Sequence, residues 1–168
     1  MRDSMSHWNR RPRPISIHSL LFRIGKNFLL DHPVSNELVR YLPPNTRHLS
    51  ELAETKMFSR DTVVGICRDK NALLITSDVE HAPFLSSPNK SSWGLILLPP
   101  MATEQSDVLR RISEGKLLLR PSAERSWMSE YVRCNRMMLD LRHNPPSITV
   151  YSDCHWVDGP QQTATPNR

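Results

Sequence analysis

The chain has 168 residues, 38% of them hydrophobic, and a formal net charge of +5, which leaves room for one domain with irregular ends. No apolar run approaches the roughly 20 residues that span a bilayer, and no signal-peptide core is found near the start. Three separated cysteines argue against a disulfide framework. These features predict a cytoplasmic protein without a membrane partner, and the basic charge favours an anionic one.

Residues 1–25 are expected to form a basic N-terminal extension. The first 14 residues are polar, basic and proline-bearing, with Trp8 as their one aromatic side chain apart from a histidine. This composition is typical of a disordered tail, and it also suits an arm that contacts a phosphate backbone. Residues 15–23 are more apolar and predict either a short strand or a short helix at the edge of the domain.

The domain itself is expected over residues 26–118, and its first elements are a strand, a helix and a strand. Asn27–Leu30 is a short buried strand. Ser35 is a candidate N-cap for a helix that Pro43 and Pro44 stop. Residues 46–49 then predict a second strand.

The central part of the domain repeats this alternation. Ser59 is the next candidate N-cap, and the helix that follows leads into an apolar run that begins at Ala72 and ends at the hydroxyl pair Thr76 and Ser77, which predicts a buried strand. Residues 93–99 form another apolar run, and Thr103 is expected to cap a last helix that closes at Gly115. Strands that alternate with helices in this way predict an α/β domain with a mostly parallel sheet and right-handed crossovers.

Residues 119–168 are expected to form a C-terminal extension that is partly disordered. Its pattern indicates a helix around residues 127–143, a strand at residues 147–151 and a loose tail after Gly159. Aromatic and basic side chains in this extension either pack on the core or contact single-stranded RNA; they are Trp127, Arg133, Arg136 and Trp156.

Four acidic residues are expected at one edge of the sheet. Asp31 follows the first strand, Asp61 lies in the first turn of a helix, and Asp78 and Glu80 follow the central strand. Strand carboxyl ends and the helix starts that follow them share one edge, so these carboxylates should converge. Alternatively they are solvated charges, with Asp61 interacting with its helix dipole.

Converging carboxylates need a compensating group. Two charges about 4 Å apart repel by roughly 4 kcal/mol at an effective dielectric near 20. Shared protons, a basic neighbour or a divalent cation could offset this repulsion. Oxygen ligands suit Mg²⁺ or Mn²⁺, which can activate water against a phosphodiester.

Four stretches of the chain form an ordered set of motifs: Phe28-Leu29-Leu30-Asp31, Ser59-Arg60-Asp61-Thr62-Val63-Val64, Leu73-Leu74-Ile75-Thr76-Ser77-Asp78-Val79-Glu80 and Gly94-Leu95-Ile96-Leu97-Leu98. Over about residues 26–118 these motifs resemble the PIN-like nucleases, in particular a small, uncharacterised bacterial subgroup often encoded beside antitoxin-like genes.

This resemblance implies a three-layer α/β/α sandwich whose acidic pocket binds Mg²⁺ or Mn²⁺ and hydrolyses RNA, as the toxin of a toxin–antitoxin pair. It assigns the catalytic and metal-binding roles to Asp31, Asp61, Asp78 and Glu80, and a supporting role to Thr76. RNA, an antitoxin protein and a second copy of the chain are the partners that follow.

The chain also departs from the pattern of this family. His32 and Pro33 replace an acid and an asparagine after the first aspartate, Glu80 replaces an aspartate, and His81 replaces a phenylalanine. One hypothesis is a retuned ribonuclease in which His32 or His81 is a proton donor or a substrate contact. The other is a catalytically inert PIN-like module that binds RNA or a protein.

Overall fold

A six-stranded sheet forms the centre of the protein, in a computed structural model that describes residues 14–23, 26–52, 58–86, 94–119 and 137–150. The strand order is β3-β2-β4-β5-β7-β8, and all neighbours are parallel except the antiparallel pair β7 and β8. The strands are β2 (Asn27–Leu30), β3 (Thr46–His48), β4 (Ala72–Thr76), β5 (Leu95–Leu97), β7 (Met137–Asp140) and β8 (Ser147–Val150).

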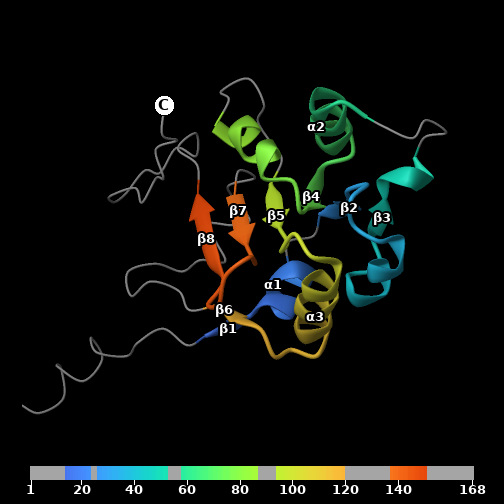
Figure 1. Cartoon of the computed structure of the whole chain (residues 1–168). Helices are drawn as coiled ribbons and strands as arrows, with labels where there is room; N and C mark the ends of the chain where they lie inside the picture. Colours follow the sequence, from blue (N-terminus) through green and yellow to red (C-terminus); the bar gives the residue numbers. More distant parts are fainter. Residues whose placement is uncertain (1–13, 24–25, 53–57, 87–93, 120–136, 151–168) are drawn as a thin grey trace, which may run out of the picture.

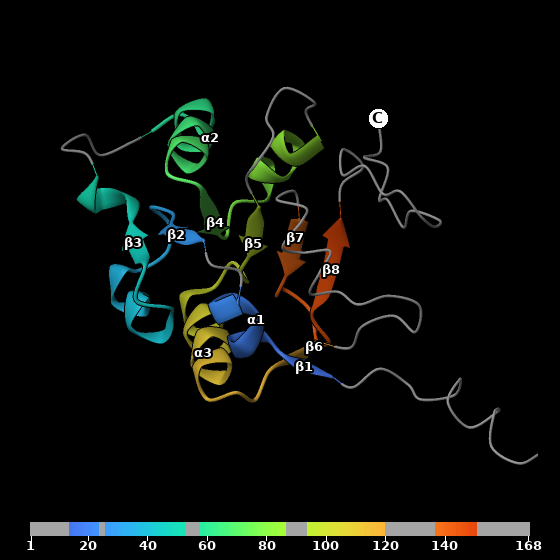
Figure 2. The same ribbon diagram turned by 180° about the vertical axis from the view of Figure 1, so that it is seen from behind.

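Helices cover both faces of this sheet. Figures 1 and 2 show α1 and α3 on one side of the strands and α2 on the other. The first face carries α1 (Ile17–Arg23), the 3₁₀ helix η1 (Asn36–Tyr41) and α3 (Ala102–Ser113). The second carries the 3₁₀ helix η2 (Leu49–Glu51), α2 (Arg60–Asp69) and the 3₁₀ helix η3 (Val79–Ser86). The predicted α/β class is thus confirmed, and the arrangement is compatible with a three-layer sandwich.

The buried side chains of the strands explain why both faces need cover. Every residue of β4 is buried, as expected for a strand in a parallel sheet with helices on either side. Successive side chains alternate between the faces, so Leu73 and Ile75 pack toward α1 and α3, whereas Leu74 packs toward α2. In β2 the same alternation sends Leu30 toward α1 and turns the next residue, Asp31, toward the α2 face.

Two of the three N-cap residues predicted from the sequence are confirmed by the structure. The Ser59 hydroxyl accepts a hydrogen bond from the backbone N–H of Thr62 at 3.2 Å, so Ser59 caps α2 as predicted. Ser35 also caps its helix, but η1 is a 3₁₀ helix. The predicted cap at Thr103 is wrong, because α3 begins at Ala102 and Thr103 lies inside its first turn.

The closing turn of α3 was predicted correctly. Gly115 has a φ of 71°, a conformation that glycine adopts without steric cost. Its N–H donates to Ile112, and the N–H of Lys116 donates to Arg111, which satisfies carbonyls of the last turn. The chain then enters β6 (Leu118–Leu119).

Residues 15–23 contain both of the elements between which the sequence left the choice open. Ile15–Ser16 forms β1, which pairs antiparallel with β6, and α1 follows at once. Ile17, Leu20 and Leu21 of α1 are buried in the core. The N-terminal extension therefore contributes to the packed domain from residue 15 onward.

The predicted helix over residues 127–143 is wrong where it can be compared. Met137–Asp140 forms β7, which lies parallel to β5, and Leu141 donates its N–H to Leu97. The strand predicted after it is confirmed as β8. The sheet thus reaches beyond residue 118. Residues 120–136, including Trp127, Arg133 and Arg136, lie outside the described residues, as do Trp8, Trp156 and the tail after Gly159.

Within the described residues, no helix combines the length and the apolar character needed to cross a membrane.

Candidate functional site

The carboxyl ends of β2 and β4 meet at a special position in the sheet. The chain leaves β2 toward β3 on one side and later returns to β4 on the other side, so the winding direction changes between these two neighbouring strands. Ligands of open α/β sheets bind at such switch points, beyond the carboxyl ends of the strands. Asp31 and Asp78 follow these two strand ends.

Asp31 is held by donors from three directions. Its backbone N–H donates to Ile75 at 2.9 Å, which fixes the residue beside the end of β4. Its Oδ1 accepts the backbone N–H of His32 at 2.8 Å, and its Oδ2 accepts the Thr76 hydroxyl at 2.6 Å. The Nε2 atom of His81 lies 3.4 Å from the same Oδ2. Only 5% of Asp31 is exposed, so these contacts replace water around the carboxylate.

Asp78 is linked to Asp31 through shared neighbours. The Thr76 hydroxyl that donates to Asp31 accepts the backbone N–H of Asp78 at 3.0 Å. His81 Nε2 lies 3.8 Å from Asp78 Oδ2, and the Arg60 Nε donates to that oxygen at 3.1 Å. Asp78 Oδ1 accepts the N–H of Glu80 at 3.0 Å and thereby caps η3. One imidazole nitrogen is therefore close to both carboxylates.

These contacts decide the charge of the Asp31 carboxyl. Burial raises its pKa, but hydrogen bonds from His81, from the Thr76 hydroxyl and from the His32 backbone outweigh burial and leave the pKa below its usual value. Asp31 is therefore ionised at neutral pH. Burial, and to a lesser extent the nearby charge of Asp31, raises the pKa of the Cys67 thiol to about 12, so Cys67 is not a nucleophile here.

Two of the four predicted acids lie together around His81 in the structure. Asp31 and Asp78 are brought together around His81, whereas Asp61 and Glu80 are exposed, in the first turns of α2 and η3. Across the described part of the chain, no three His, Cys, Asp or Glu side chains are grouped closely enough to hold a metal ion. Hard cations such as Mg²⁺ are often held by only one or two carboxylates together with substrate oxygens. The two aspartates fit that role.

Aromatic rings border the site next to Asp31. The His32 ring stacks on Phe58 with 5.6 Å between centroids and meets the His48 ring edge-on at 5.9 Å. His48 is fixed by contacts of its Nε2 with the Val34 carbonyl, at 2.7 Å, and of its Nδ1 with Ser50. His32 and Phe58 are half-buried, and the backbone N–H of His32 that binds Asp31 connects this cluster to the acid pair.

Two features of this sheet edge were missed by sequence reasoning. Arg60 contacts Asp78, and its place directly after the N-cap Ser59 would have put it at the same edge as Asp61. Asp140, at the end of β7, forms a two-point ion pair with Arg142, at 2.9 and 2.6 Å. No local pattern indicates that pair, because the sequence predicts a helix over residues 137–140, where the structure has a strand.

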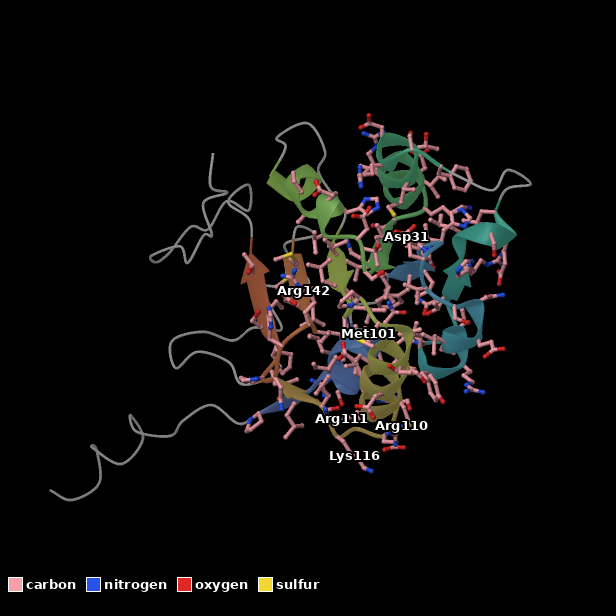
Figure 3. All side chains as sticks on the ribbon, in the orientation of Figure 1. Asp31, Met101, Arg110, Arg111, Lys116 and Arg142 are labelled. Carbon is pink, nitrogen blue, oxygen red and sulfur yellow. The ribbon has the colours of Figure 1, made fainter. Side chains whose placement is uncertain are left out.

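The basic side chains near the end of α3 do not belong to this site. In Figure 3, Arg110, Arg111 and Lys116 gather around α3, while Asp31 lies away from them, at the sheet and toward α2. Arg110 and Lys116 are also paired with acids of their own surface, at 2.6 Å for the Arg110–Asp107 contact. The arginine that contacts the acid pair is Arg60.

No family model matches the chain, and no curated protein or solved structure is similar enough to count as a match. The resemblance to PIN-like nucleases therefore rests on the motifs of the sequence.

Proposed function

We propose that the protein is a PIN-like ribonuclease that uses Mg²⁺ or Mn²⁺ to hydrolyse RNA phosphodiesters. One observation carries the proposal: Asp31 and Asp78, at the ends of the adjacent parallel strands β2 and β4, converge on one imidazole at the switch point of the sheet. The lowered pKa of Asp31 keeps that carboxyl ionised at neutral pH, as a ligand of a cation must be.

Each residue at this edge has a place in the proposed chemistry. A cation bound there would activate a water molecule and neutralise charge on the scissile phosphate. Asp31 and Asp78 would hold the cation, and the exposed Asp61 and Glu80 would contact its water molecules. The Arg60 side chain is about half exposed, and its guanidinium has N–H groups besides the one that contacts Asp78. These N–H groups suit the non-bridging oxygens of a phosphate.

The proposed biological setting is that of a cytoplasmic toxin paired with an antitoxin protein. It follows from the subgroup of nucleases that the motifs resemble, and the net charge of +5 supports RNA as the substrate. A homodimer is the proposed alternative to an antitoxin-bound chain. Size measurement with and without co-expressed neighbouring genes would separate these two states.

The test is cleavage of labelled single-stranded RNA by purified protein with Mn²⁺ or Mg²⁺, and with a chelator. We expect Asp78→Asn to reduce cleavage to background while its circular dichroism is unchanged. Asp69→Asn is the matched control, because Asp69 is an exposed acid at the last turn of α2, at the opposite edge of the sheet. Equal cleavage by wild type and Asp78→Asn would show that a contaminant is responsible and refute the proposal.

A second candidate function is a catalytically inert PIN-like module that binds RNA or a protein. It is favoured by the saturation of the acid pair, because every carboxylate oxygen of Asp31 and Asp78 already has a protein donor. In that case RNA affinity should fall steeply with salt and should not respond to divalent ions beyond their ionic strength. Metal-dependent turnover of RNA would rule this function out.

A further inference from the structure

The acid pair already has a complete set of partners inside the protein. Asp31 accepts hydrogen bonds at both oxygens, from His32 and Thr76, and Asp78 does so from Glu80 and Arg60. Both Oδ2 atoms also face His81 Nε2. An added cation therefore cannot reach the two Oδ2 atoms without replacing at least one of these contacts.

His81 is the partner that lies between the two carboxylates. Its Nε2 faces an oxygen of each, at 3.4 and 3.8 Å, and oxygens that only accept hydrogen bonds require Nε2 to carry a hydrogen. The residue is 3% exposed and belongs to the first turn of η3, where its backbone N–H donates to the Asp78 carbonyl. The imidazole is thus built into the site and is not a surface group that contacts it by chance.

The other contacts would survive the arrival of a cation. The backbone N–H groups of His32 and Glu80 bind the Oδ1 atoms, away from the Oδ2 atoms that face His81. The Thr76 hydroxyl binds Asp31 Oδ2, and a carboxylate oxygen has a second lone pair for another partner. Arg60 contacts only Asp78, and its side chain is about half exposed, so it can move into solvent. Of the described side chains, His81 is the buried one that faces a carboxylate oxygen of both acids, because the equally buried Thr76 contacts Asp78 only at its backbone N–H.

We infer that His81 competes with a divalent cation for Asp31 and Asp78, so that the Nε2–H group occupies the place of the ion and a metal binds only when the imidazole moves away. This inference rests on the proposed function, because it concerns the same acid pair. It makes His81 a positioning residue that weakens metal affinity and keeps the buried Asp31 compensated when no metal is bound.

The test compares Mn²⁺ binding by calorimetry in wild type, His81→Phe and Arg60→Gln, with melting temperatures measured alongside. His81→Phe keeps a buried aromatic ring and removes the donor, so we expect Mn²⁺ to bind about tenfold more tightly, a change of about 1.4 kcal/mol. Without metal the variant should melt at a lower temperature than wild type, and Mn²⁺ should raise its melting temperature more than that of wild type.

Arg60→Gln is the matched control because it removes the positive charge that contacts Asp78 but leaves His81 in place. We expect it to change Mn²⁺ affinity much less than His81→Phe. Equal tightening in the two variants would mean that general electrostatics sets the affinity, and it would overturn the inference. Unchanged Mn²⁺ affinity in a folded His81→Phe protein would also overturn it.

Nitrogen NMR of wild type keeps the inference testable if His81→Phe does not fold. Titration with Mg²⁺ should shift the His81 Nε2 resonance as Mg²⁺ saturates, because the imidazole leaves the carboxylates. If the Asp78 resonances shift with Mg²⁺ while the His81 resonance does not, the competition is refuted. The proposed nuclease function would remain supported. If neither wild type nor His81→Phe binds a divalent ion, both the inference and the proposed nuclease fail.

Discussion

Thr76→Val should destabilise the fold strongly, because Thr76 joins the two acids. Its fully buried hydroxyl donates to Asp31 and accepts from the N–H of Asp78. A hydrogen bond to a charged group contributes about 1.5–3 kcal/mol, and a neutral one about 0.5–1.5 kcal/mol. Valine has nearly the same shape, so the loss is chiefly these two bonds. We expect a decrease of about 2–4 kcal/mol in the free energy of unfolding at pH 7.

The assay is urea unfolding followed by circular dichroism, with Thr46→Val as the matched control. Thr46 is also a buried threonine of the same sheet, but its hydroxyl has no hydrogen-bond partner among the described residues. Replacing this unsatisfied hydroxyl with a methyl group should be neutral or slightly stabilising. Thr76→Val should therefore lower the free energy of unfolding strongly, whereas Thr46→Val should leave it unchanged or raise it slightly.

The pH dependence gives a second check on Thr76→Val. The pKa of Asp31 is lower in the folded protein than the unfolded value of about 3.9, so its hydrogen bonds add stability above that value. This contribution is lost as the pH falls through the folded pKa. The deficit of Thr76→Val should therefore be full at pH 7 and shrink below about pH 4. A deficit that is equal for the two valine variants, or independent of pH, would refute the role given to Thr76.

Three further predictions concern the fold. Gly115→Ala should lower the free energy of unfolding by about 1 kcal/mol, because Gly115 has a φ of 71°. Gly65→Ala inside α2 should raise it by about 0.5–1 kcal/mol, because an added Cβ there meets no other atom within 4 Å. Urea midpoints test both variants. Cys67 should resist alkylation at pH 8 until the protein is unfolded, which peptide mapping by mass spectrometry can follow. Arg142→Met should destabilise by about 1–3 kcal/mol, because the buried Asp140 loses both guanidinium hydrogen bonds and keeps only the backbone N–H of residue 142. Equal urea midpoints at pH 7 would contradict this.

Local sequence patterns were sufficient for the elements whose signals are short-range. The apolar run of β4, the cap at Ser59 and the glycine after α3 each act within a few residues, and each appears in the structure. The convergence of Asp31 and Asp78 was also predictable, because parallel strands place their carboxyl ends at one edge.

The errors came from features that depend on distant contacts. The apolar residues of β7 are compatible with a helix and with a strand, and pairing with β5 decides between the two. Likewise, no local pattern could show that His81, three residues after Asp78, turns back between the two acids. The acids need a compensating group, and the sequence predicts shared protons, a basic neighbour or a divalent cation, with oxygen ligands favouring the cation.

The central claim is that Asp31 and Asp78 form a working cation site. Its most direct test is a calorimetric titration of Mn²⁺ and Mg²⁺ into wild type and Asp78→Asn, both confirmed as folded. We predict saturable binding in wild type that is absent in Asp78→Asn. Absence of binding in wild type at millimolar ion, or equal binding in the two proteins, would contradict the claim.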